Sequence, residues 1–330
     1  MKEKESVRIT ECGVFPGIIV LCRDISGKRK ADRAEISVTG VNGQCCTICC
    51  CLEGRSEFRD EKKYYYLTEG DMRISLSESP ADCSQADYLF DREENVSGGN
   101  GTITEGNGPG GNDNLKELYY PLGRCREVLL MIDRGRIPDE ISILSGDVIV
   151  NPSLLIEKYC VGDKSFIASA GKEISSIFLE LYRLCREGKE ALIKILTMEL
   201  LLRMQDMSAV DERKTRQHFT HGQVLLVKGV CEYMLSRPDE RHTIEELSKK
   251  FHVSGTQLKN TFKGVYGTSV YAFIRGEKMR AAANDLRETD LSVLEIAGKY
   301  GYENGSKFAR AFRDTLGVSP NGYRLAIRHG

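Results

Sequence analysis

The stretch that decides the fold is TIEELSKKFHVSGTQLKNTFKGVYGTS, residues 243–269. Thr243 can cap a short helix, and Glu246, three residues later, completes a capping box. Ser254 can cap the next helix after a turn at His252. The apolar positions are Ile244, Leu247 and Phe251 in the first helix and Leu258 and Phe262 in the second. Two short helices joined by a tight turn, with polar outward positions on the second, are typical of a helix-turn-helix unit.

The same pattern recurs about 50 residues later, in SVLEIAGKYGYENGSKFARAFRDTLGVSPNGYR at 292–324. A shift of 50 residues aligns caps, apolar positions and glycines: Ser254 with Asn304, Leu258 with Phe308, Phe262 with Phe312, Gly267 with Gly317, Ser269 with Ser319, and Phe273 with Tyr323. Leu247 matches Ile296 at 49, which indicates one inserted residue near the second turn. The sequence therefore predicts two helix-turn-helix units rather than two unrelated hairpins.

Between the two units, residues 269–288 can form one helix of about five turns, roughly 30 Å long. One turn of DNA is about 34 Å. A rigid rod of that length suits two recognition helices that enter successive major grooves on one face of a duplex.

These residues resemble the DNA-binding domain of the AraC/XylS family of bacterial transcriptional regulators, over about 222–328. The matching positions are Ile296-Ala297, Gly301-Tyr302, Phe308, Phe312, Gly317, Ser319-Pro320 and Tyr323-Arg324. Val270 departs from the pattern, because the first repeat often has proline there, which affects a helix start rather than the DNA surface. The resemblance implies double-stranded DNA and RNA polymerase as partners. It also implies recognition helices at 254–265 and 304–315.

The helical wheel names the outward positions of both recognition helices. They are Thr256, Gln257, Lys259, Asn260 and Lys263 in the first and Gly305, Ser306, Lys307, Arg310 and Arg313 in the second, with Ser254 and Asn304 at the helix starts. Asn260 suits adenine and Arg310 suits guanine, through paired donors and acceptors on major-groove edges. The lysines suit phosphate, which positions the protein without specifying sequence. The alternative for each is an ordinary solvated side chain.

Charge and composition agree with this division. The chain has 330 residues, which suggests two domains. Residues 222–330 hold 17 Lys+Arg and 12 Asp+Glu, a net +5, and residues 1–221 hold 30 and 36, a net −6. No apolar run approaches the roughly 18–20 residues needed to cross a bilayer, so no membrane partner is expected. The charged start, MKEKESVRIT, lacks the apolar core of a secretory signal, so we expect a cytoplasmic protein with reduced thiols.

The remaining chain predicts an α+β protein. Residues 1–165 contain short alternating runs, among them 14–22, 36–41 and 64–67, that favour a β-sandwich or barrel. A Gly-rich segment at 97–114 predicts a surface insertion. The family resemblance implies a cupin-like sensory domain here, which binds a small-molecule effector, dimerises, or both. An all-α domain at 222–330 follows.

Between these domains, residues 171–206 predict two helices and 207–221 a polar linker. Apolar residues cover more than one side of the helices: Ile174, Ile177, Phe178, Leu181, Leu192, Leu196 and Leu200. A helix of this kind needs more than one partner. The helices therefore either pack on the β-domain or form the seam of a homodimer, and the sequence leaves both open.

The segment QCCTICCCLEGR, residues 44–55, raises a separate question, because it holds five cysteines in seven residues. None of the five histidines lies in 1–217, which excludes a histidine-based metal cupin and a Cys-His nucleophile pair there. We therefore expect no enzyme, no catalytic residue, no metal and no cofactor. Thr47 and Ile48 favour an extended strand that ends in a turn at LEGR, with the thiols as small buried hydrophobes. The alternative is a redox or soft-metal sensor built on Cys45–Cys51.

Overall fold

The computed structural model describes residues 6–32, 44–60, 62–77, 117–143, 148–160, 165–208, 210–212 and 215–328. The chain divides into two compact units, Ser6–His218 and Phe219–Gly330, and each has its own core. The strand expected at 36–41 and the Gly-rich segment 97–114 lie outside the described residues.

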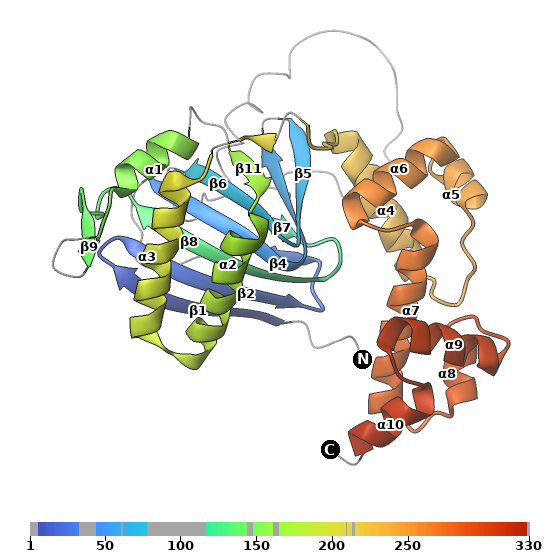
Figure 1. Ribbon diagram of the computed structural model, residues 1–330. Helices are drawn as coiled ribbons and strands as arrows, with labels where there is room; N and C mark the ends of the chain where they lie inside the picture. The colour runs from blue at the N-terminus through green and yellow to red at the C-terminus, as the bar shows by residue number, and fades with distance from the viewer. Residues whose placement is uncertain are drawn as a thin grey trace, which may run out of the picture. The chain divides into compact units, whose positions relative to one another are not determined.

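The first unit is built on a seven-stranded antiparallel sheet (Figure 1). Its strands run in the order β1 (Ser6–Phe15), β2 (Ile18–Ser26), β8 (Arg124–Asp133), β4 (Cys45–Asp60), β6 (Asp71–Ser77) and β11 (Phe166–Ser169), and β5 (Lys63–Thr68) pairs with the end of β4. Two small sheets pair β3 (Lys30–Asp32) with β7 (Glu117–Tyr119) and β9 (Ile141–Ile143) with β10 (Val148–Val150).

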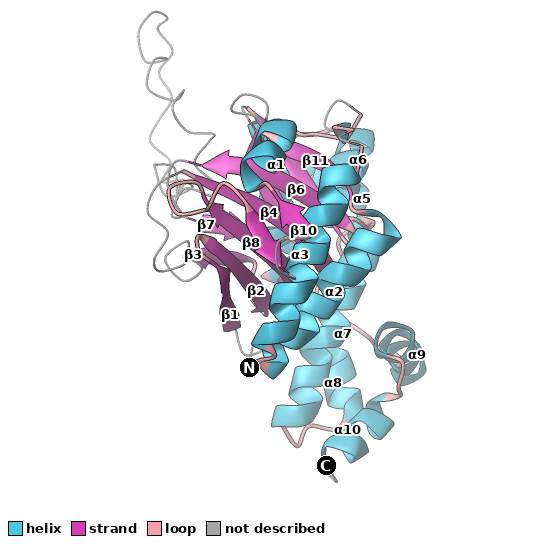
Figure 2. Cartoon of the chain, turned by 60° about the vertical axis from the view of Figure 1, so that its left-hand side comes forward, coloured by secondary structure: helices cyan, strands magenta, loops and turns pink. Residues whose placement is uncertain are grey.

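Three helices cover one face of the sheet: α1 (Pro152–Tyr159), α2 (Gly171–Glu187) and α3 (Glu190–Asp206) (Figures 1 and 2). Their apolar sides form one core with the sheet. Among the described strands no pairing joins β1 to β11, so the sheet is open and the closed cupin-like barrel expected from the family resemblance is not found. The physical reason is that helices, rather than sheet closure, bury this face.

Two local expectations about the strands were wrong, both because of a glycine with positive φ. The apolar run 14–22 is a hairpin, since Pro16 and Gly17 (φ 72°) turn the chain between β1 and β2. The expected turn at LEGR is instead a bulge between Cys51 and Glu53, next to Gly54 (φ 87°). A bulge bends a strand without ending it, so β4 continues and pairs with β5.

The cysteine-rich segment forms the start of β4, which confirms the expected strand. Alternation divides its thiols between two cores. Cys46 and Cys50 face the helices, whereas Cys45, Cys49 and Cys51 lie in a second cluster on the other face of the sheet. All five are buried, so they pack as small hydrophobes.

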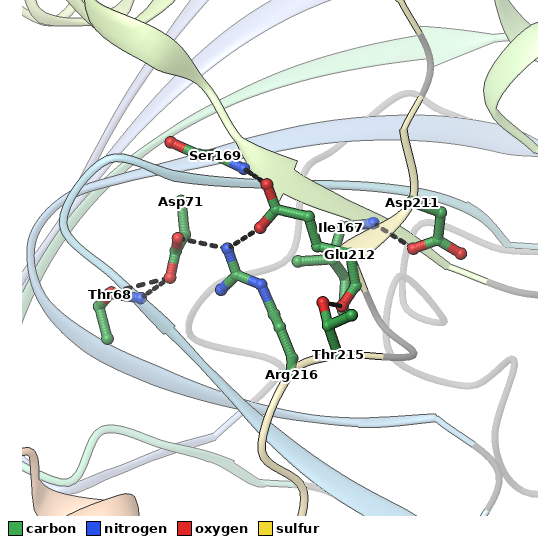
Figure 3. Close-up of polar contacts among 8 residues, drawn as sticks. All are labelled: Thr68, Asp71, Ile167, Ser169, Asp211, Glu212, Thr215 and Arg216. Carbon is green, nitrogen blue, oxygen red and sulfur yellow. Dashed lines mark hydrogen bonds and ion pairs between the residues drawn. The ribbon is translucent and has the colours of Figure 1, made fainter.

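The segment after α3 is held against the edge strand β11 (Figure 3). The carboxylates of Asp211 and Glu212 accept hydrogen bonds from the backbone N–H groups of Ile167 (3.4 Å) and Ser169 (3.2 Å). Arg216 donates to both Glu212 (2.9 Å) and Asp71 (2.7 Å). Carboxylates thus take the place of a further strand on this exposed edge. We call the described residues 211, 212, 215 and 216 the strap.

The second unit is built from helices. Its helices are α4 (His221–Leu235), α5 (Ile244–Lys250), α6 (Gly255–Tyr266), α7 (Val270–Glu288), α8 (Val293–Lys299), α9 (Gly305–Leu316) and α10 (Pro320–Arg328). The long helix α7 runs from the α5–α6 pair to the α8–α9 pair (Figure 1). The structure therefore has the expected helix-turn-helix region, which follows a β-rich domain along the chain.

Candidate nucleic-acid interface

The two helix-turn-helix units begin in the same way. Thr243 and Glu246 form a complete capping box on α5, and Ser292 and Glu295 form one on α8. Both glutamates are exposed, and hydrogen bonds with the capping residues lower their pKa values. The two first helices are therefore fixed by identical local chemistry.

The turns of the two units differ, and the inserted residue lies there. His252 makes the first turn with φ 51°, a conformation that few non-glycine residues adopt. Gly301 makes the second turn with φ 76°. The following caps are Ser254 and Asn304. Two residues lie between Gly301 and its cap in the second unit, and one lies between His252 and its cap in the first.

Buried aromatic side chains hold both recognition helices, α6 and α9, against their units. Phe262 and Phe312 are fully buried and lie at equivalent positions. Phe262 meets Phe273 edge to face at 5.4 Å between ring centroids, and Phe312 meets Tyr323 in the same way at 5.7 Å. Such contacts fix which side of each helix points outward.

Nearly all the predicted DNA-contacting residues lie on the surface. Those exposed are Ser254, Thr256, Gln257, Lys259, Asn260, Lys263, Asn304, Ser306, Lys307, Arg310 and Arg313, and Gly305 is partly buried. Two of them have a structural task as well. Ser254 accepts a hydrogen bond from the N–H of Gln257, and Asn304 accepts from Ser306 and Lys307, so both cap their helices.

The cations on these faces are free of ion pairs. In the described part of the chain no salt bridge involves Lys259 or Lys263 on α6, or Lys307, Arg310 or Arg313 on α9. Arginines elsewhere, such as Arg183 on α2, are paired with carboxylates. Unpaired cations on a convex helix face attract a polyanion without first breaking an intramolecular contact.

The rod α7 is anchored near its middle and at its C-terminal end. It has 19 residues, which corresponds to about 28 Å. At its end the buried carboxylate of Asp285 accepts from the Tyr300 hydroxyl (2.8 Å) and pairs with Lys299 (2.8 Å), so α7 is tied to α8. Burial and the hydrogen bond to Asp285 raise the pKa of Tyr300. Near its middle, Lys278 donates to the Glu240 carbonyl (3.1 Å), which ties α7 to the loop before α5.

The predicted dimerisation residues have a different environment from the one expected of a seam. Five of them are buried in the chain's own core between helices and sheet: Ile174, Ile177, Phe178, Leu181 and Leu200. Leu192 is exposed and Leu196 is partly buried. Leu179 and Ile195, which the sequence reasoning did not select, are also exposed. An apolar stripe shows that a helix face is covered, but it does not show by what.

No group of three or more His, Cys, Asp or Glu side chains within the described ranges is placed to hold a metal ion. No helix in the same ranges is long and apolar enough to cross a membrane.

The family model and the two curated relatives described next each match a quarter to a third of this chain. A family model described as a helix-turn-helix domain matches residues 247–326. YdiP of Escherichia coli strain K12, an uncharacterized HTH-type transcriptional regulator, is 35% identical over 105 residues, which are 32% of this chain and 35% of YdiP. The HTH-type transcriptional activator AarP of Providencia stuartii is 27% identical over 112 residues, 34% of this chain and 82% of AarP.

Among solved structures, the C-terminal domain of AraT, a response regulator from Geobacillus stearothermophilus, is 30% identical. The match covers 31% of this chain and 84% of the AraT domain, with a TM-score of 0.30. The aligned part of this chain thus spans about a third of the length of YdiP and most of the length of AarP.

The C-terminal unit is a helix-turn-helix domain of the kind found in transcriptional regulators. With its doubled unit, this C-terminal domain is of the AraC type.

Proposed function

We propose that this protein is a sequence-specific DNA-binding transcriptional regulator in which α6 and α9 enter successive major grooves. The observation that carries the proposal is the pair of exposed polar faces, each with unpaired cations, on two helices anchored to one rod. The match of the domain to transcriptional regulators supports it. The rod of about 28 Å is close to the 34 Å repeat of DNA.

Within these faces we assign different tasks to different residues. The Asn260 amide can pair with adenine, and the Arg310 guanidinium can pair with O6 and N7 of guanine at once. Lys307 is close to the start of α9 and carries a point charge, which suits phosphate. The side chains of Arg310 and Lys307 are both exposed, and neither has to leave an ion pair to reach DNA.

The experiment compares Arg310→Ala with Lys307→Ala, its matched control on the same helix face. Operator fragments retained from genomic DNA are first identified, and affinity is then measured on single-base variants at two salt concentrations. Arg310→Ala should lose about 1–3 kcal/mol of discrimination at one base pair. Lys307→Ala should weaken all sequences alike and reduce the salt slope by about one unit. Equal weakening of every sequence by Arg310→Ala would show that Arg310 is a phosphate contact instead.

For the first unit we propose a sensory and dimerising role, with a small-molecule effector and, by family resemblance, RNA polymerase as a further partner of the whole protein. A non-enzymatic role agrees with the regulators that the chain matches. The surface offered to a second copy is the outer side of the α2–α3 hairpin, where Leu179, Leu192 and Ile195 are about half exposed or more. Exposed leucine and isoleucine on two adjacent helices are typical of a protein contact.

A further inference from the structure

Pairs of cysteines meet inside the first unit. The Sγ atoms of Cys46 on β4 and Cys160 at the end of α1 are 3.9 Å apart, close to van der Waals contact. Two other pairs interact as well: Cys185 raises the pKa of Cys22, and Cys51 raises the pKa of Cys125. All these cysteines are reduced, and the question is which of them an oxidant can reach.

The three cysteine pairs differ in how accessible their thiols are to solvent. Cys160 is partly exposed, whereas its partner Cys46 and both members of the other two pairs are buried. A thiol reacts as the thiolate, so its reactivity depends on solvent access and on nearby positive charge. Cys160 therefore has an advantage in access that the other paired thiols lack.

Charge adds to this advantage. The hydrogen bond from Cys46 lowers the pKa of Cys160, and the positive charge of Arg134 lowers it further, against the effect of burial. Burial raises the pKa of Cys12, which is the other partly exposed cysteine among the described residues. Burial also raises the pKa of Cys50, which lies on the same face of β4 as Cys46.

We propose that Cys46 and Cys160 are a redox-active pair that hydrogen peroxide converts into a reversible disulfide. The Cys160 thiolate attacks one peroxide oxygen; the S–O bond forms as the O–O bond breaks, and the second oxygen leaves as water after taking up a proton. The Cys46 sulfur then attacks the sulfenic acid, the S–S bond forms, and the hydroxyl leaves as water with the Cys46 proton. Two thiols and one peroxide give one disulfide and two waters, and a dithiol such as dithiothreitol reverses the change.

The position of Cys160 connects this chemistry to the linker. Lys158 donates to the carbonyls of Met204 (3.1 Å) and Gln205 (2.6 Å), and the Tyr159 hydroxyl donates to Met204 (2.7 Å). The end of α1 thus satisfies the last carbonyls of α3, from which the chain continues into the strap. To bond, the two sulfur atoms must approach by about 2 Å. The disulfide therefore draws the end of α1 toward β4 and strains its hydrogen bonds to α3.

The experiment uses the full chain with Cys83→Ser. Cys83 lies outside the described residues, and its removal leaves only cysteines that the structure describes. The protein is treated with stoichiometric peroxide, free thiols are alkylated, and the unreduced digest is analysed by mass spectrometry. A Cys46–Cys160 cross-linked peptide is expected. It should be lost in Cys160→Ser and kept in Cys45→Ser, the matched control whose thiol faces the other core. Arg134→Gln should slow cross-linking at neutral pH and move its pH profile upward.

Hydrogen exchange tests the connection to the linker. Oxidation should increase exchange in a peptide that contains residues 204–207, and this increase should be absent in Cys160→Ser. The proposed Cys46–Cys160 pair would be wrong if the dominant cross-link joined other cysteines, such as Cys12 and Cys185. It would also be wrong if Cys160 were overoxidised while Cys46 stayed free. Unchanged hydrogen exchange at residues 204–207 in the cross-linked protein would contradict the connection between the disulfide and the linker. The cross-link is measured without DNA, so its failure is independent of the proposed function, and only its regulatory meaning rests on that function.

Discussion

Replacement of Arg216 by methionine should weaken the strap, because one guanidinium joins Glu212 of the strap to Asp71 on β6. Arg216 lies between Asp71 and Glu212, and the side chains of Arg216 and Asp71 are only 20% and 10% exposed. Breaking a buried ion pair from one side costs about 3–5 kcal/mol. Asp71 keeps two hydrogen bonds of 2.8 Å from Thr68 after the change, which reduces the loss. We expect about 2 kcal/mol, close to the value of one charged hydrogen bond.

The pKa of Asp71 determines how the stability difference between wild type and Arg216→Met changes with pH. Burial raises the pKa of Asp71, but hydrogen bonds from Arg216 and Thr68 outweigh it and hold the pKa below its usual value. A carboxylate with a depressed folded pKa stabilises the fold above its unfolded pKa, about 3.9, and loses that contribution as the pH falls through the folded value. The difference between wild type and Arg216→Met should therefore be full at pH 7 and shrink below about pH 4.

The assay combines thermal unfolding with hydrogen exchange. For a unit of this size, about 2 kcal/mol corresponds to roughly 4–8 °C in Tm. The amides of Ile167 and Ser169 should exchange faster in the variant, since their carboxylate acceptors belong to the strap. Arg183→Met is the control, because its ion pairs on α2 are exposed to solvent, and it should change neither measurement. An equal loss at pH 3 and pH 7, or unchanged exchange of the two amides, would refute the reasoning.

Two further outcomes are expected. Gly301→Ala should destabilise the second unit by at least about 1 kcal/mol from the left-handed backbone alone, and by more because the new Cβ would lie 2.4 Å from the Asp239 carbonyl oxygen. Calorimetry measures the effect, with Gly298→Ala as the control, because Gly298 has open space around it. Equal Tm values for the two variants would contradict the prediction. Leu192→Glu combined with Ile195→Glu should convert a dimer to monomers in sedimentation experiments without a loss of helical signal, because both residues are exposed; an unchanged dimer would place the seam elsewhere.

The second unit was the easier part to predict, because its signals are local and occur twice. The capping boxes at Thr243 and Ser292, the caps Ser254 and Asn304, and the buried phenylalanines each act within a few residues along the chain. The exposure of Arg310 followed directly from the periodicity. Which bases it meets does not follow from these signals, because that depends on how the helix lies in the groove.

The first unit was harder, because its structure depends on contacts between distant residues. Alternation on β4 correctly divided the cysteines between two faces, but the same alternation suits a barrel, a sandwich or an open sheet covered by helices. The stripe through Phe178 correctly showed a covered helix face. It gave no sign that the cover was the sheet of the same chain. The contact of Cys46 with Cys160 spans 114 positions, so no local pattern announces it.

The two turns show why similar units keep different residues. His252 and Gly301 both have a left-handed backbone, which a non-glycine residue can adopt at a modest cost. At Gly301 a second requirement applies, because the carbonyl of Asp239, in the loop before α5, occupies the place where a Cβ would lie. That loop also receives Lys278 from the rod. The glycine of the second turn therefore serves the packing of the two helix-turn-helix units against each other. This packing sets the relation between α6 and α9 on which the proposed binding to successive grooves depends.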